Sequence, residues 1–357
     1  MRYLVVPSRD TEKWREDLLS LGWLARDHQV IKRGEYRGIP LADSAPPELP
    51  EPFCDQECLE FETEQPPPAD HIGFLREAVG AEVFEQFSEH WPRSYDQMGD
   101  LLILKIPEEV QAYSEQIGEA LLAHVSRARL VLQDHGVRGE YRVRRLEIVT
   151  SRDGDQTTET TVRENHCEML VDPARVYYSP RLSGERARTV SAAASLREQL
   201  GRSLRVCDPY AGAGPALMPL LKAGLVESLL ANDLNPAAGT LLEANLSRSR
   251  VRMDIRCLDA RLLALEGELT GAFDLLLVNI PHSSLDHLGD LLPLLERGQP
   301  SLLRAWCIIE QHETSTVAGR LEELLELDGR QQRSLSVTPV RSYSPSHDHL
   351  LLEAWLD

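Results

Sequence analysis

The stretch Leu204-Arg-Val-Cys-Asp-Pro-Tyr-Ala-Gly-Ala-Gly-Pro215 decides the fold. It begins as a short apolar strand, which is followed by the carboxylate of Asp208 and by a turn that contains Gly212 and Gly214. Glycine lets a backbone bend tightly and approach a ligand closely, and Pro215 can open a helix because the N–H that it lacks would be unpaired there. The stretch therefore predicts a small-ligand site between a strand and a helix.

Apolar and amphipathic segments alternate after Asp172, which is the pattern of an α/β sheet with helices on its faces. Seven strands are expected, at 204–207, 228–232, 253–257, 273–278, 303–309, 332–338 and 348–355. Helices are expected near 185–199, 215–223, 236–246, 283–295 and 314–326. The glycine turn departs from the G-x-G-x-x-G of dinucleotide-binding proteins and favours S-adenosylmethionine. We therefore predict an α/β fold in which residues 173–357 form a Rossmann-like class I methyltransferase domain with a seven-stranded sheet.

A carboxylate follows each of the first three strands of this series: Asp208, then Asp233 and then Asp259. Ligands of open α/β sheets bind outside the carboxyl ends of the strands, so the three acids should surround one ligand. Asp233 is placed to accept the ribose hydroxyls and Asp259 to meet the adenine edge, although each acid alone can be a helix N-cap. The expected cofactor-binding residues are Asp208, Gly212, Gly214, Asp233, Leu234, Asp259, Ala260 and Asn279.

The fourth strand runs into Asn279-Ile-Pro-His-Ser-Ser284. An asparagine before a proline-fixed turn places a carboxamide, which both donates and accepts, at the mouth of the methyl-donor pocket. Methyltransferases that modify planar, amide-like nitrogens use such a turn. His282 is a candidate base, but a lone histidine in a turn is more often a surface residue.

Composition divides the N-terminal half into three parts. Residues 1–45 are expected to form a small β/α module, with strands at 2–6, 29–31 and 36–40 and a helix at 12–21. Residues 46–69 are rich in Pro, Glu and Asp, which is typical of a linker. Residues 70–172 are expected to form an α+β domain. Its helices are expected at 71–79, 81–87 and 108–124, and its strands at 100–106, 130–132, 146–150, 158–162 and 167–171.

Charge and cysteine usage limit the classes of function. The net charge of −19 argues against nonspecific affinity for nucleic acid, so any RNA binding depends on a local patch. Arginines do gather between residues 127 and 188, although the strand at 139–147 can carry them simply as a solvated face. No apolar run has the length to cross a bilayer and no signal peptide is visible, which predicts a cytoplasmic protein. Cys54 and Cys58 are the only close cysteine pair in the sequence. The sequence leaves open whether they form a disulfide, and no metal site is expected.

Several motifs together resemble one family, the archaeal and eukaryotic tRNA (guanine-N1)-methyltransferases that act on guanosine 37, beside the anticodon. The resemblance covers essentially the whole chain, including the small N-terminal module. The related wybutosine aminocarboxypropyl transferases share the fold and the cofactor. The motifs are Gly139-Glu-Tyr-Arg-Val-Arg, Arg163-Glu-Asn, Val176-Tyr-Tyr-Ser-Pro-Arg-Leu-Ser-Gly-Glu-Arg-Ala-Arg188, Asp208-Pro-Tyr-Ala-Gly-Ala-Gly-Pro, Asn232-Asp-Leu-Asn-Pro, Asn279-Ile-Pro-His-Ser and Arg341-Ser-Tyr-Ser-Pro345.

The resemblance implies roles for particular residues. Methyl transfer to guanine N1 requires loss of the N1 proton, and the negative charge that is left spreads onto O6, so a carboxylate and a cation are needed. By similarity, Glu185 is the general base and Arg142 donates to O6, while Asn279 and the Pro281 turn hold the purine and Tyr177 shapes the pocket. Glu185 is also explained as a first-turn carboxylate that stabilises its helix.

The resemblance also implies the partner. Arg144, Arg181 and Arg186 are expected to meet tRNA, the N-terminal module to dock on the tRNA elbow, and the target base to be flipped out of the anticodon loop. A monomer without an obligatory protein partner is expected. Two alternatives stay open: aminocarboxypropyl or methyl transfer to a wyosine precursor at the same position, and a catalytically inactive tRNA-binding paralogue.

Overall fold

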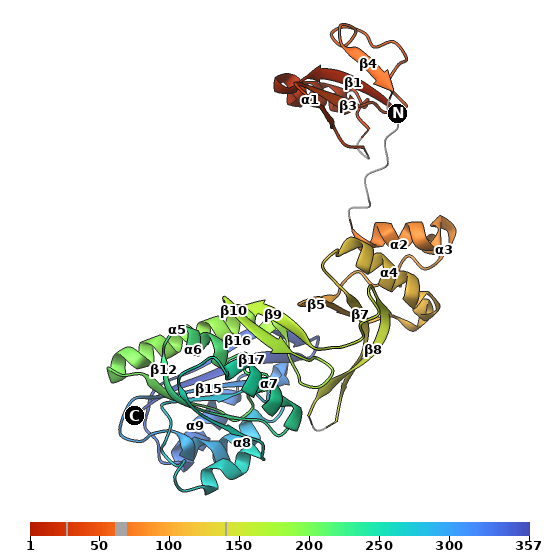
Figure 1. The fold of residues 1–357 in the computed structure, drawn as a ribbon. Helices are drawn as coiled ribbons and strands as arrows, with labels where there is room; N and C mark the ends of the chain where they lie inside the picture. Colours follow the sequence, from red (N-terminus) through yellow and green to blue (C-terminus); the bar gives the residue numbers. More distant parts are fainter. Residues whose placement is uncertain (26–27, 61–69, 140) are drawn as a thin grey trace. The chain divides into compact units, whose positions relative to one another are not determined.

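The structure is a computed structural model of the 357-residue chain, and it describes residues 1–25, 28–60, 70–139 and 141–357. The chain forms two compact units, Met1–Ala78 and Val79–Asp357 (Figure 1). No helix of the described residues is long and apolar enough to span a membrane. The four-part division expected from composition stays a prediction.

The first unit is a four-stranded antiparallel sheet of order β2-β3-β1-β4, with one helix packed on it. Alternating apolar residues in the first strand bury Leu4 and Val6 against Leu18 of the helix and Ile39 of the third strand. The elements are β1 (Arg2–Pro7), η1 (Ser8–Asp10), α1 (Thr11–Ser20), β2 (Ile31–Arg33), β3 (Tyr36–Pro40), β4 (Glu57–Glu60) and α2 (His71–Val79).

Part of the segment that composition assigned to a linker belongs to this unit. Leu49 and Phe53 are buried in its core, and the rings of Trp14 and Trp23 contact Phe53. The strand β4 then pairs antiparallel with β1. Two large apolar side chains among many prolines and acids are enough to anchor this part of the segment to the first unit. The rest of the expected linker, residues 61–69, lies outside the described residues.

The second unit begins with an α+β layer whose sheet has the order β5-β6-β7-β8, with an antiparallel pair beside it. Its core is continuous with the larger sheet that follows, because Leu132 and Val171 share one buried cluster with Ala238 and Leu241. The elements are α3 (Ala81–Gln86), β5 (Asp96–Met98), β6 (Leu101–Leu104), η2 (Glu108–Tyr113), α4 (Ser114–His124), β7 (Leu130–Arg138), β8 (Val143–Ser151), β9 (Thr160–Glu164) and β10 (Cys167–Val171).

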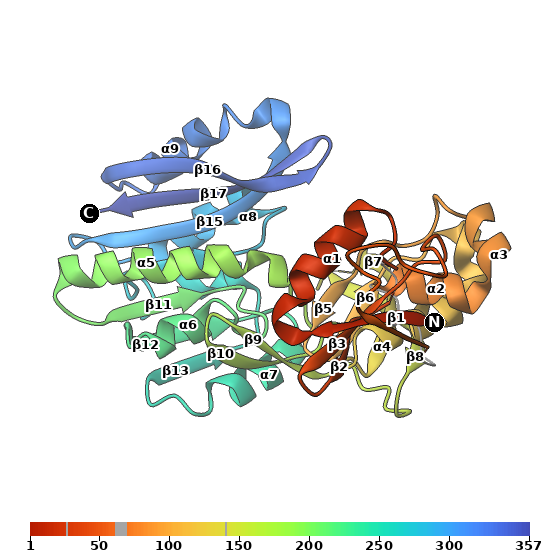
Figure 2. The same cartoon turned by 90° about the horizontal axis from the view of Figure 1, so that it is seen from above.

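The seven-stranded sheet expected from the alternation is present, with the order β13-β12-β11-β14-β15-β17-β16 (Figure 2). The first five strands in sequence are parallel, and the last two form an antiparallel hairpin on β15. The strands are β11 (Leu204–Asp208), β12 (Val226–Asn232), β13 (Arg252–Arg256), β14 (Leu275–Val278), β15 (Ser301–Glu310), β16 (Gln332–Ser344) and β17 (His347–Leu356).

Each face of this sheet carries its own core because neighbouring side chains on a strand point to opposite sides. Val206 packs with α5, α6 and α7, whereas Cys207 packs with η4, α8, η5 and α9. The helices are η3 (Pro180–Leu182), α5 (Ser183–Leu200), α6 (Leu217–Lys222), α7 (Pro236–Leu246), η4 (Ala260–Leu265), α8 (Ser284–Leu291), η5 (Leu292–Leu294), η6 (Gln311–Glu313) and α9 (Val317–Leu327). The class I methyltransferase architecture is thereby confirmed.

The strand order fixes where a ligand binds. The chain passes from β11 outward to β12 and β13, and then returns to place β14 on the other side of β11. In open α/β sheets a crevice forms at such a reversal, outside the carboxyl ends of the strands. The glycine turn after β11 and the Asn279 turn after β14 flank this reversal.

Candidate active site

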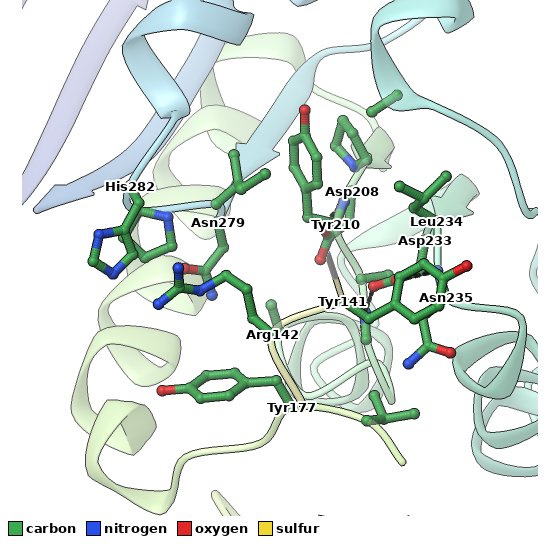
Figure 3. A pocket seen from close by; sticks show the side chains of 18 of the residues that line it. Tyr141, Arg142, Tyr177, Asp208, Tyr210, Asp233, Leu234, Asn235, Asn279 and His282 are labelled. Atoms are coloured by element: carbon green, nitrogen blue, oxygen red, sulfur yellow. Dashed lines mark hydrogen bonds between the residues drawn. The ribbon is translucent and has the colours of Figure 1, made fainter. Parts of the chain in front are cut away.

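A cavity of about 410 Å³ lies at the reversal of strand order. It is lined by turns that follow β11, β12, β13 and β14, by the segment 176–179 before α5, by the tip of the β7–β8 hairpin and by the ends of β15, β16 and β17 (Figure 3). The expected residues that line it are Arg142, Tyr177, Arg186, Asp208, Gly212, Asp233, Leu234, Asp259, Ala260, Asn279 and Pro281. The expected residues outside its lining are Arg144, Arg181, Glu185 and Gly214.

Asp233 locks the glycine turn to the second strand. Its Oδ2 accepts a hydrogen bond of 2.8 Å from the Gly212 amide, and its Oδ1 accepts one of 2.9 Å from the Asn235 amide. Gly212 has a φ of 55°, a left-handed conformation that glycine adopts without steric cost. Burial raises the pKa of Asp233. Each carboxylate oxygen retains a second lone pair, so the side chain can still accept two hydroxyl hydrogen bonds from a ligand.

Asp259 and Gly214 have local structural roles. Asp259 caps η4 by accepting from the Arg261 amide, and its carboxylate also pairs with the Arg261 guanidinium, which lowers the pKa of Asp259. The N-cap alternative therefore holds for Asp259, which nevertheless lines the cavity. Gly214 has a φ of 84°, and a Cβ there would lie 3.1 Å from the Leu242 side chain, so this glycine permits close packing on α7.

The other end of the cavity carries the Asn279 turn and the expected O6 donor. Arg142 lies in the β7–β8 turn with a φ of 51°, and its guanidinium points toward Asn279 and His282 (Figure 3). Tyr177 is 44% exposed and lines the same space. The structure thus brings together Arg142, Asn279, Pro281 and Tyr177, which come from three segments far apart in the sequence.

Glu185 is not among the residues that line the cavity. It is buried in the first turn of α5, one turn after the cavity-lining Leu182. One carboxylate oxygen pairs with Arg188, and the other, Oε2, is buried without a hydrogen-bond partner among the described residues. Of the expected acid and cation pair, only Arg142 contributes to the cavity surface.

The three arginines expected to meet RNA pair with carboxylates of this chain. Arg144 bridges Asp96 and Asp134, and the exposed Arg181 pairs with Asp96 at 2.6 Å. Arg186 is buried, and Glu164 holds its guanidinium. The gathering of arginines between residues 127 and 188 therefore reflects, in part, internal charge neutralisation.

Other lining residues were not found from the sequence. Tyr210 and His287 join through a 2.6 Å hydrogen bond between Oη and Nδ1 near Asp259. Arg341, Tyr343 and His349 of the β16–β17 hairpin line the opposite end. His282, which the sequence favoured as a surface residue, is exposed and also lines the cavity. For Arg341 and Tyr343 the only signal was their place in the motif Arg341-Ser-Tyr-Ser-Pro345.

We expect Asp208→Asn to stabilise the protein in a pH-dependent manner. Burial raises the pKa of Asp208 from 3.8 to about 7. The folded state then binds a proton that the unfolded chain releases, so stability falls as the pH rises from about 4 to about 7. Above that window the ionised carboxylate costs the fold up to about 4 kcal/mol, since one pKa unit corresponds to about 1.4 kcal/mol.

Asparagine removes this cost and keeps the oxygen that accepts from the Tyr210 amide. Urea unfolding of Asp208→Asn should give a free energy of unfolding raised by about 1–4 kcal/mol at pH 8 and nearly unchanged at pH 4. An equal change at both pH values would show that Asp208 does not titrate in this way.

Comparison with known proteins identifies the family. Residues 75–157 match the TYW2 N-terminal domain, and residues 160–314 match the TRM5/TYW2 methyltransferase domain. The tRNA (guanine(37)-N(1))-methyltransferase Trm5b of Pyrococcus abyssi is 31% identical over 287 residues, which cover 79% of this chain and 78% of that protein. Its crystal structure superposes with a TM-score of 0.72 at 26% identity, covering 100% of this chain and 99% of the other.

Two further solved structures share the fold. The complex of aTrm5 and tRNALeu has a TM-score of 0.74 at 24% identity and covers 100% of both chains. The M. jannaschii TYW2 in complex with AdoMet has a TM-score of 0.54 at 18% identity, covering 74% of this chain and 99% of that one. With the methyltransferase domain, the sheet order and the Trm5b relative in agreement, this chain belongs to the TRM5/TYW2 methyltransferase family.

Proposed function

We propose that this protein transfers a methyl group from S-adenosylmethionine to N1 of guanosine 37 in tRNA. The observation that carries the proposal is the division of one cavity into two ends. The carboxylates that line it lie at the ends of β11, β12 and β13, whereas Arg142 and the Asn279 turn lie at the other end. The Trm5b relative of Pyrococcus abyssi, which is named for this reaction, supports the choice of substrate.

The residues present fit S-adenosylmethionine. Asp233 has free lone pairs for the ribose hydroxyls, and Leu234 and Ala260 offer apolar surface to the adenine ring. Asp259 lies beside Ala260 to meet the polar edge of the adenine. When bound, the cofactor supplies an electrophilic methyl group on its sulfonium. Tyr177 and Asn279 line the same cavity as Arg142.

The chain's own groups then prepare the guanine. The Asn279 carboxamide can donate to and accept from the purine edge, and Pro281 fixes the turn that carries it. Arg142 donates to O6, where negative charge accumulates as the N1 proton leaves, and a preorganised donor of this kind stabilises the transition state. Removing a single donor to such an oxygen typically costs about 10²–10³ in rate.

Glu185 is the proposed general base, which accepts the proton that N1 loses. Two features support this role: its side chain is shielded from solvent, and its Oε2 has no hydrogen-bond partner among the described residues. The role requires the carboxylate to turn from Arg188 toward the cavity when the guanine enters. The Arg188 contact is a pair of residues three apart on α5, which a change of side-chain rotamer can break.

The remaining parts of the proposal concern the RNA. The target base is flipped out of the anticodon loop, because an enzyme that acts on an atom of a stacked base must first take that base out of the stack. We place the first unit on the tRNA elbow, and we infer that a monomer acts without a further protein. A cytoplasmic location stays a prediction.

Two labels on the donor test the proposed reaction. The protein is incubated with an unmodified tRNA transcript and S-adenosylmethionine that carries label either in the methyl group or in the carboxyl group. Methyl label alone should enter the tRNA. Carboxyl label would indicate aminocarboxypropyl transfer instead, and no incorporation of either label would favour a tRNA-binding paralogue without activity.

A further inference from the structure

The β16–β17 hairpin brings a second group of polar side chains to the cavity. Arg341 and Tyr343 come from β16, His349 from β17 and His282 from the turn after β14, and we call these four residues the hairpin corner. The ring of His282 packs edge-on against Tyr343 at 5.7 Å. None of these four residues is acidic, and the three carboxylates that line the cavity, Asp208, Asp233 and Asp259, lie at or after the ends of β11, β12 and β13.

Two side chains of the hairpin corner have buried nitrogens without a hydrogen-bond partner among the described residues. His349 is 2% exposed, and neither of its ring nitrogens has a hydrogen-bond partner in the described part of the chain. Nε of Arg341 is also buried and unpaired there. Buried polar groups are nearly always hydrogen-bonded, because leaving one unsatisfied costs free energy. Unpaired groups that line a cavity therefore point to a ligand that supplies the missing partner.

The electrostatics of the corner specify the sign of that ligand. Burial, Arg341 and His282 lower the pKa of His349 to about 4. Burial, Arg142 and His347 lower the pKa of His282. Besides burial, the groups that lower these two pKa values are cations or other histidines, so this side of the cavity disfavours further positive charge and favours an anion. Asp286, Glu310 and Glu313 share a second cavity with His282 and do not line this one. Arg144 and Arg186 differ from Arg341 because carboxylates already neutralise them.

We propose that the hairpin corner binds one phosphate of the RNA backbone, at or beside the target nucleotide. A phosphate offers negative charge and oxygens that accept several hydrogen bonds, which Arg341 and His349 can donate together. A neutral base edge would supply acceptors but would leave the excess positive charge uncompensated. The inference rests on the proposed function, which supplies RNA as the ligand and assigns Arg142 to the guanine.

The position of the corner agrees with this ligand. His282 belongs to the Asn279 turn and its ring contacts Tyr343 of β16, so a base held at that turn would have its sugar-phosphate chain close to the hairpin. The carboxylate of the methyl donor is the other anion in the cavity, but the cofactor end is built from the turns after β11, β12 and β13. A phosphate contact here would hold the flipped nucleotide by its backbone while the Asn279 turn holds its base.

The test combines one protein change with one RNA change. Full-length tRNA is assembled with a single uncharged methylphosphonate at each linkage from position 35 to position 39 in turn. With the wild-type protein, replacing one phosphate adjacent to guanosine 37 by the uncharged methylphosphonate should lower kcat/KM about tenfold or more. Arg341→Gln should show a similar loss with natural tRNA and no further loss at that linkage, whereas Arg341→Lys should recover part of it.

Two other variants make the outcome specific. Arg333→Gln removes an exposed guanidinium from the same strand, outside the cavity lining, and should keep the full wild-type sensitivity to every linkage. His349→Gln should reproduce the insensitivity of Arg341→Gln. Equal sensitivity of Arg341→Gln and the wild type at every linkage would overturn the proposal, and so would a weaker affinity of Arg341→Gln for S-adenosylmethionine, which would assign the corner to the donor's carboxylate.

Failure of this inference is separable from failure of the proposed function. If the wild type does not methylate natural tRNA, the proposed function fails. The affinities of the wild type and Arg341→Gln for the natural and methylphosphonate tRNAs are then compared by filter binding. If methylation occurs normally but no linkage interacts with Arg341, the function stands and the phosphate site is rejected.

Discussion

Glu185→Gln is expected to slow methyl transfer to tRNA by about 10²–10⁴-fold while S-adenosylmethionine still binds with wild-type affinity. This range is the usual contribution of a positioned general base. Glutamine keeps the shape of the side chain but cannot take up the N1 proton of guanine. Single-turnover kinetics under saturating tRNA isolate this step from binding and product release.

A helix-stabilising role for Glu185 would give a different result. A carboxylate in the first turn of α5 stabilises the helix by about 0.3–1 kcal/mol, so its loss would lower the melting temperature slightly without a large change in rate. Glu198→Gln is the matched control, since it removes an exposed carboxylate near the other end of the same helix. A rate for Glu185→Gln within a few-fold of the control would remove Glu185 from the mechanism.

The second large effect is expected for the cofactor. Asp233→Asn should raise the Kd for S-adenosylmethionine by about 100-fold or more, because two charge-assisted hydrogen bonds from ribose hydroxyls are each worth about 1.5–3 kcal/mol. The amide group of asparagine also turns an N–H toward either the Gly212 amide or the Asn235 amide, which now donate to the carboxylate. Isothermal titration calorimetry measures the change directly.

Glu227→Gln provides the control for Asp233→Asn. Glu227 is an exposed carboxylate near the start of β12, whereas Asp233 follows the end of that strand at the cavity. Its substitution changes the net charge by the same amount and should leave the Kd unchanged. If Asp233→Asn bound the cofactor as tightly as Glu227→Gln, the ribose would have to lie elsewhere in the cavity.

The parts of the site that the sequence predicts are those set by local chain order. Asp208 ends a strand, Asp233 and Asn279 each follow one directly, and Gly212 lies in the turn after Asp208. The carboxyl ends of parallel strands meet at one edge of a sheet. Periodicity located the seven strands, and the strand order then places these turns around one crevice. The residues at the cofactor-binding end of the cavity could therefore be predicted from the order of the strands along the chain.

The rest of the cavity depends on contacts between distant segments. His349 lines it only because β17 pairs antiparallel with β15, which sets His349 opposite Ile308. No local pattern around His349 indicates this register. In the same way, nothing in the sequence shows that Arg144 and Arg186 will meet Asp96 and Glu164 rather than RNA. Ion pairing between remote side chains is decided by tertiary packing.

Glu185 illustrates a third situation. Resemblance to a family suggested its role, whereas periodicity alone described it as one more residue in the first turn of α5. The structure adds that the side chain is buried, outside the cavity lining, and paired with Arg188.

Nucleoside analysis of the reaction product tests the central claim most directly. A tRNA transcript with guanosine 37 and a matched transcript with adenosine at that position are each incubated with the protein and S-adenosylmethionine, then digested and analysed by mass spectrometry. The account predicts about one 1-methylguanosine per molecule of the first transcript and none in the second. Equal 1-methylguanosine in both transcripts, a base carrying an aminocarboxypropyl group, or no modified guanosine at all would contradict it.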